Sequence, residues 1–231
     1  MLDPQGSGSD SNYSRLTGGE TGGNLEGNLT LQKASGGTGG DVTASFTIGG
    51  SVLSSANLTI PVLKATLSIG GSLSGAVTVS DKIDGGRLSV GGNVGSGANI
   101  TIADMVNSPE PLNFSSNFAG DLVLQTGIKE ASGRSITFNN SAGAFAANGN
   151  IRVGPVSTTP PLGSVTFDGA IKIKDGSGSG GDLTGTIQVV GCHATSADLD
   201  ICICGNNSGW VEIIQSGCTN QVDWSCVSGC P

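Results

Sequence analysis

The residues of this sequence that are best suited to chemistry are its six cysteines, all within the last 40 positions. An even number of cysteines confined to one short segment predicts three disulfides, for which fifteen pairings are conceivable. Disulfides persist in oxidising compartments, so these residues predict an extracellular or cell-surface protein. The six are Cys192, Cys202, Cys204, Cys218, Cys226 and Cys230.

Zinc binding is the alternative use of these cysteines. Structural zinc sites usually pair their ligands as C-x₂₋₄-C. This segment has C-x-C at 202–204 and C-x₃-C at 226–230, with His193 beside Cys192. The spacing matches no zinc class, so disulfides are favoured over a metal site.

The residues that catalysis would need are sparse. His193 is the only histidine, so a Ser–His–Asp triad would have to use it, and no G-x-S-x-G nucleophile elbow is present. β-Helices that cleave polysaccharides need clustered Asp, Arg or Lys and an aromatic platform, whereas the ten basic residues of this chain are scattered. We therefore expect a protein that is not an enzyme and has no catalytic residues.

The 18 acidic residues are also scattered. Two pairs, Asp81 with Asp84 and Asp198 with Asp200, offer oxygen ligands of the kind that calcium prefers. The sequence has neither an EF-hand nor a calcium-binding nonapeptide array, and solvated surface acids are the favoured interpretation. We predict no cofactor, with weak Ca²⁺ binding as the one option left open.

The net charge of −8 disfavours binding to phosphate backbones and anionic lipids. We expect no nucleic-acid partner. No run of 18 apolar residues occurs, which predicts no membrane span, and the first 20 residues lack the apolar core of a signal peptide.

Apolar–x–apolar dyads, the minimal pattern of a half-buried strand, recur along the chain. In the clearest stretch successive dyads start 9 to 12 residues apart. The dyads are Leu29/Leu31, Phe46/Ile48, Leu58/Ile60, Leu67/Ile69, Val77/Val79, Leu88/Val90, Ile100/Ile102, Leu112/Phe114, Leu122/Leu124, Ile136/Phe138, Ile151/Val153, Val165/Phe167 and Ile187/Val189, with Ile201/Ile203 and Val211/Ile213 as further rungs in the cysteine-rich tail.

Every second dyad marks a longer period, with 19 residues from Leu58 to Val77, 23 from Val77 to Ile100 and 22 from Ile100 to Leu122. Three short strands in a turn of about 22 residues predict a three-sided parallel β-helix with rungs about 4.8 Å apart. In this arrangement the pairs Ile69/Val90 and Leu73/Val94 stack inward. A third, weaker element follows each second dyad, at 70–75, 91–97, 115–120 and 139–143.

We therefore predict an all-β protein, a parallel β-solenoid with a disulfide-rich C-terminal cap that includes Trp210 and Trp224. Its 40 glycines suit corners that need positive φ or close backbone approach. A β-sandwich is the main rival, but it gives no reason for a 22-residue period, and a Gly-rich linker would not keep the dyads in register. The predicted parts are a polar arm (1–21), the solenoid (22–190) and the cap (191–231), with the longer loops at 107–111, 127–133, 154–163 and 175–182.

The repeat unit A-N-L-T-I…L-S-I-G-G-S-L-S-G-A-V-T-V…L-S-V-G-G-N-V-G-S-G-A-N-I-T-I resembles the Gly-rich β-helical repeats of bacterial cell-surface proteins, including adhesin-like and planctomycete-type secreted repeat proteins. The resemblance covers about residues 22–190, and the cysteine-rich tail departs from it. It implies an extracellular scaffold.

Three functions stay open at this point. The first is a structural subunit of a filament or surface layer that self-associates through its ends and its N-terminal arm. The second is an adhesive module that binds a surface glycan. The third is an ice-binding solenoid or a polysaccharide-active β-helix. Ice binding is disfavoured because threonine occurs once per strand, as in L-T-I, without a doubled row.

Overall fold

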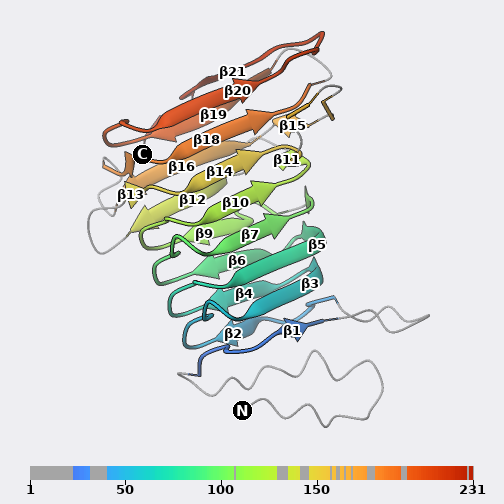
Figure 1. Ribbon diagram of the computed structural model, residues 1–231, viewed down its shortest axis with the longest axis vertical. Helices are drawn as coiled ribbons and strands as arrows, with labels where there is room; N and C mark the ends of the chain where they lie inside the picture. Colours follow the sequence, from blue (N-terminus) through green and yellow to red (C-terminus); the bar gives the residue numbers. More distant parts are fainter. Residues whose placement is uncertain are drawn as a thin grey trace, which may run out of the picture.

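The structure is a computed structural model, and its described residues form a solenoid of stacked parallel strands without a helix (Figure 1). The predicted polar arm, residues 1–21, lies outside the described residues. The described residues are 23–31, 41–106, 108–128, 135–140, 146–156, 158–159, 162–163, 165–167, 169–175, 180–193, 197–227 and 229–230.

Two large parallel sheets form two sides of the solenoid, so the predicted fold class is confirmed. The first sheet contains, in spatial order, β1 (Leu29–Thr30), β3 (Asn57–Leu63), β5 (Ala76–Asp84), β7 (Asn99–Ile102), β10 (Asp121–Leu124), β14 (Asn150–Val153), β18 (Thr186–Val190) and β20 (Trp210–Ile214), with β8 (Met105–Val106) also beside β5. The second contains β2 (Phe46–Ile48), β4 (Thr66–Ile69), β6 (Arg87–Val90), β9 (Leu112–Phe114), β12 (Ser135–Asn140), β16 (Ala170–Asp175), β19 (Ala197–Ile203) and β21 (Val222–Ser225).

The third side is a column of single-residue bridges and a short ladder. Leu73 bridges Val52 on one side and Val94 on the other, as the period predicts. The fourth predicted member of this side, within 139–143, is wrong: Asn139 and Asn140 belong to β12, and Ala147 bridges Phe118 instead. One short ladder, β13 (Ala146–Ala147) with β17 (Asp182–Leu183), continues this column. The other, β11 (Gly127–Ile128) with β15 (Thr166–Phe167), lies on the opposite side, where the chain passes from the first sheet to the second.

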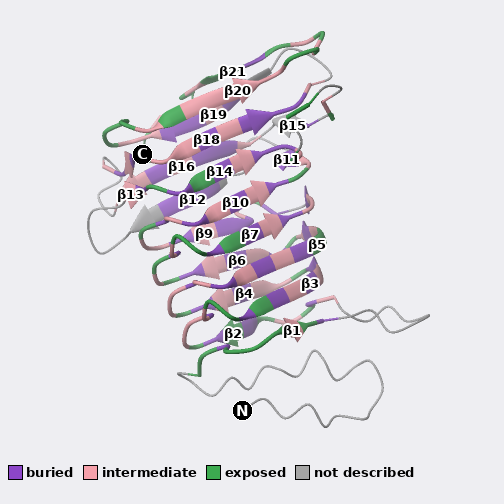
Figure 2. Cartoon of the chain, viewed as in Figure 1, coloured by how far each residue is buried: buried purple, intermediate pink, exposed green. Residues whose placement is uncertain are grey.

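The dyads fill the interior as continuous columns. Val77 pairs with Leu58 and Ile100, and Val90 pairs with Ile69. All five side chains are at most 1% exposed, while the residues between them face outward, so buried and more exposed positions alternate along the strands (Figure 2). The core is therefore a narrow stack of Val, Leu and Ile, with a cluster of three buried rings, Phe114, Phe118 and Phe138, in the middle turns.

One rung of the second sheet differs from the prediction. The expected dyad Val165/Phe167 is not part of that sheet, because Phe167 lies in the side ladder of β15 with β11. The rung is formed by Ile171 and Ile173 of β16, which pair with the dyad of β12. The sequence A-I-K-I-K carries the same pattern, but the long loop before it displaces it from the expected period.

Two of the later turns are long, as the predicted loops require. Leu122 pairs with Ile151, 29 residues later, and Ile151 pairs with Ile187, 36 residues later. The extra residues lie between strands, so the inward columns stay in register.

A stack of glycines forms one corner of the early turns. The Gly71 N–H donates to the Gly50 carbonyl oxygen at 2.8 Å, and the Gly92 N–H donates to the Gly71 carbonyl oxygen at 3.0 Å. A Cβ on Gly92 would lie 2.6 Å from the Gly71 carbonyl carbon, closer than real Cβ atoms come to such atoms. This corner therefore requires glycine because the backbones approach closely.

Candidate functional site

Three disulfides fasten the last turn of the solenoid to the turn before it. They join Cys192 to Cys218, Cys202 to Cys226 and Cys204 to Cys230, with Cα–Cα distances of 5.3, 4.7 and 5.6 Å. The sequence separations of 26, 24 and 26 residues each correspond to one turn. All six cysteines are paired, which confirms the predicted three-disulfide framework.

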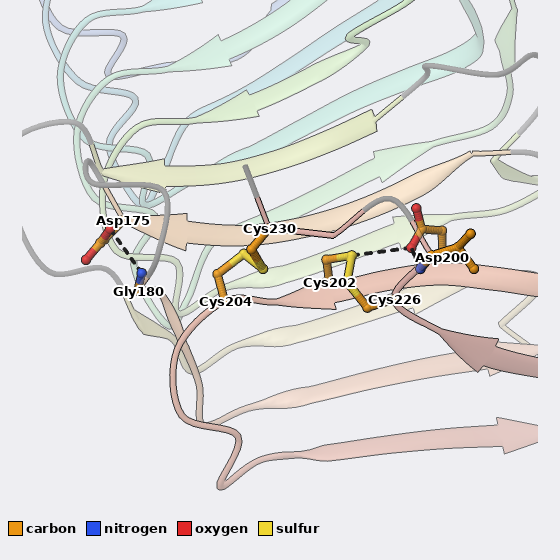
Figure 3. Close-up of a disulfide and its surroundings, with 8 residues drawn as sticks. Asp175, Gly180, Asp200, Cys202, Cys204, Cys226 and Cys230 are labelled. Carbon is orange, nitrogen blue, oxygen red and sulfur yellow. Dashed lines mark hydrogen bonds between the residues drawn. A yellow bond between two sulfur atoms is a disulfide. The ribbon is translucent and has the colours of Figure 1, made fainter.

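The segment after β21, which we call the terminal strap (226–227 and 229–230), lies along β19. Cys202 occupies an outward position, opposite Lys172 of β16, yet it is fully buried. The Val227 N–H donates to Asp200 Oδ1 at 2.8 Å, and the Cys202 Sγ lies 3.3 Å from the same oxygen (Figure 3). The strap therefore covers the outer side of β19 at the end of the second sheet.

Among the candidate metal ligands that the structure describes, one group of three lies close together. Asp200, Cys202 and Cys226 are the one group of three potential ligands among the described residues, and both sulfurs are consumed by their disulfide. Because thiolates are the zinc ligands, this group does not support the zinc alternative. Asp84 forms an ion pair with Lys82 at 3.7 Å.

The sequence offered three further candidate residues, His193, Asp81 and Asp198. The His193 carbonyl oxygen accepts a hydrogen bond from the Asn220 side-chain amide at 3.2 Å, which connects the last two turns. Asp81 is an exposed residue of β5. The Asp198 side chain lies outside the described part of β19.

Trp224 lies on β21, the last strand of the second sheet. It pairs with Leu199 of the preceding rung, and Leu199 is fully buried. Trp224 is 38% exposed. It therefore occupies the inward position next to Leu199 on an edge strand, and its predicted capping role stays a prediction.

The end of the first sheet is left open. Its last strand, β20, pairs with β18 and with no other described strand. Val211 and Ile213 occupy inward positions and remain partly exposed, although their partners on β18, Ile187 and Val189, are at most 1% exposed. β20 is thus an edge with unpaired backbone groups and two apolar side chains that lack a covering rung.

Trp210 does not have the capping role that the sequence suggested. It pairs with Thr186, an outward position, and is 66% exposed. Its indole therefore projects from the outer face of the first sheet.

A hydrogen-bonded ladder lies on the outer face beside Trp210. Arg152 Nη1 donates to Gln188 Oε1 at 2.5 Å, and Gln188 Nε2 donates to Glu212 Oε2 at 2.6 Å. Arg152 also binds two carbonyl oxygens, of Pro155 and Val156. Burial lowers the pKa of Arg152, and the charge of Glu212 opposes that shift. The ladder connects three successive rungs and holds Glu212 on the terminal strand.

Two neighbouring columns on the outer face of the first sheet carry no charge in the early turns. Thr30, Thr59, Thr78 and Thr101 form one column through successive strand pairs, and Asn57, Ala76 and Asn99 form part of the column beside it. The threonines thus make a single row, as the sequence predicted.

Sequence reasoning placed Val211 and Ile213 on a rung but missed that this rung is the open edge. The signal was available, because the only later dyad, Val222/Trp224, belongs to the second sheet. The hydrogen-bonded ladder of Arg152, Gln188 and Glu212 joins residues that are 36 and 24 positions apart in the sequence. It could not be predicted without knowing the strand register of the later turns.

The described residues contain no helix that is long and apolar enough to span a membrane. Comparison with known proteins finds no family model, curated protein or solved structure that matches this chain.

Proposed function

We propose that this chain is an extracellular structural subunit that self-associates end to end, as part of a filament or surface layer. The observation that carries the proposal is the open edge of β20, where Val211 and Ile213 are partly exposed. An exposed edge strand is a template for another chain, and soluble proteins usually blunt such edges. The last strand of the second sheet, β21, is also an edge among the described residues, but its inward Val222 is fully buried, whereas both inward side chains of β20 remain partly exposed.

The disulfides support this role because they stabilise the terminal rung. Each one links the last turn to its neighbour, and each is worth about 2–4 kcal/mol. An edge that is held in strand conformation loses little conformational entropy when a partner pairs with it. Disulfides also favour an oxidising, extracellular location, as does the resemblance of the repeats to bacterial cell-surface proteins.

The proposal is tested by sedimentation and electron microscopy of the full chain over a range of concentrations. We expect the particle mass to rise with concentration. Ile213→Lys should weaken association by at least about tenfold, because covering a lysine at this inward position costs at least about 1.4 kcal/mol. The control is Thr78→Lys, an outward and partly exposed position on an inner rung, which should associate nearly as wild type. A mass that stays monomeric at every concentration would refute the proposal.

A second candidate, a glycan-binding adhesive module, is favoured by Trp210. An exposed indole beside fixed polar groups, here Gln188 and Glu212, offers both an apolar face and hydrogen-bonding partners to a sugar ring. Glycan-array binding that is lost in Trp210→Ala but retained in Trp224→Ala would favour this function. Absence of glycan binding by the wild-type chain would exclude it for the glycans tested.

A further inference from the structure

We infer that the partner of β20 is the first rung of a second copy of this chain, with β1 of that copy extending the first sheet in parallel. In this joint Val211 lies opposite Leu29 of the second copy, and Ile213 lies opposite Leu31. The inference rests on the proposed self-association and specifies its contact surface and register.

The two inward columns of the first sheet carry the inference. One column begins at Leu29 and ends at Val211, and the other begins at Leu31 and ends at Ile213. Between these ends, every rung contributes a branched aliphatic residue to each column. The inner residues are Leu58, Val77, Ile100, Leu122, Ile151 and Ile187 in the first column and Ile60, Val79, Ile102, Leu124, Val153 and Val189 in the second. A second copy placed on β20 in this register continues both columns without a break.

Among the described residues, the first rung also has no strand partner on its outer side. β1 pairs with β3 and with no other described strand. All strand pairs in the described residues are parallel, so a copy stacked in the same orientation repeats the existing geometry. Such a contact joins two different surfaces and does not close, which gives an open filament.

Residues 1–21 of a second copy are a less suitable occupant of this edge. Their sequence, MLDPQGSGSDSNYSRLTGGET, contains no pair of apolar residues two positions apart. A strand formed from it cannot fill two adjacent inward columns at once, whereas Leu29 and Leu31 can.

The joint belongs to the first sheet. The third side ends in the exposed polar residue Asn207, which bridges Leu183. The last strand of the second sheet, β21, pairs only with residues 197–200 of β19, and the strap follows it. A single strand pair with two apolar columns therefore makes the contact, and we expect it to be reversible.

Cysteine cross-linking tests this register with the full chain. Glu212 and Thr30 occupy the same outward column, and native cysteines on adjacent rungs already form disulfides at Cα–Cα distances of 4.7–5.6 Å. One protein carries Glu212→Cys and the other carries Thr30→Cys, and the two are mixed under mild oxidation. We expect a disulfide-linked dimer in the mixture, identified by its cross-linked peptide, and none when Thr78→Cys, an outward residue of an inner rung, replaces Thr30→Cys.

The outcomes separate this inference from the proposed function. Dimers of Glu212→Cys alone would show a tail-to-tail contact and overturn the joint. Association of the wild-type chain without cross-linking in the mixture would also overturn the joint but leave self-association standing. If deletion of residues 1–20 abolished association, the arm would be the occupant instead. A wild-type chain that never associates would refute both the joint and the proposed function.

A second pair of variants repeats the test if either first variant misfolds. It combines Trp210→Cys with Asn28→Cys, which lie in the adjacent outward column.

Discussion

Gly92 lies directly above Gly71 at one corner of the solenoid, and its N–H donates to the Gly71 carbonyl oxygen at 3.0 Å. The stack leaves no space for a side chain, since a Cβ on Gly92 would lie 2.6 Å from the Gly71 carbonyl carbon. The spacing of successive rungs at this corner thus depends on glycine.

Gly92→Ala should therefore destabilise the protein by about 1–3 kcal/mol, because the new methyl group forces the backbones apart. The matched control is Gly97→Ala, where the nearest atom to a new Cβ lies 3.9 Å away. The control should be close to neutral. Urea denaturation monitored by circular dichroism measures both changes, and equal effects would contradict the close-packed corner.

Ile69→Asp should prevent the solenoid from folding stably, because it buries a carboxylate in an inward column at a cost of several kcal/mol. Ser68→Asp is the control on the same strand, at an outward and partly exposed position. Loss of the β-type circular dichroism signal is expected for Ile69→Asp alone. An unchanged spectrum and melting curve for that variant would reject the inward assignment.

Thiol titration of the denatured, unreduced chain should find no free thiol, because all six cysteines are paired. Replacing Cys204 and Cys230 with serine should cost about 2–4 kcal/mol of unfolding free energy. Hydrogen exchange should locate the loss of protection in the last turn, with the turns around Val77 unaffected. Two or more free thiols per wild-type chain would contradict the disulfide framework.

Sequence periodicity was sufficient for the fold because each inward dyad is local and repeats at a nearly constant interval. It failed where loops change that interval, at Val165/Phe167 and Ile171/Ile173. The ends of the solenoid were harder to predict. Trp210 and Trp224 are both tryptophans of the cysteine-rich tail, and the sequence assigned them the same role. Trp210 faces outward, whereas Trp224 occupies the inward position next to Leu199. Only the register of the last rung distinguishes the two positions.

Amide hydrogen exchange of Val211 and Ile213 as a function of protein concentration tests the central claim most directly. Inward residues of earlier rungs, such as Leu31 and Leu73, donate their N–H groups to the following rung. By the same alternation the N–H groups of Val211 and Ile213 point toward the open side of β20. Self-association through this edge predicts slow exchange at both amides at high concentration and fast exchange after dilution, with the Val189 amide protected throughout. Fast exchange at both amides in samples whose particle mass has risen would contradict the claim.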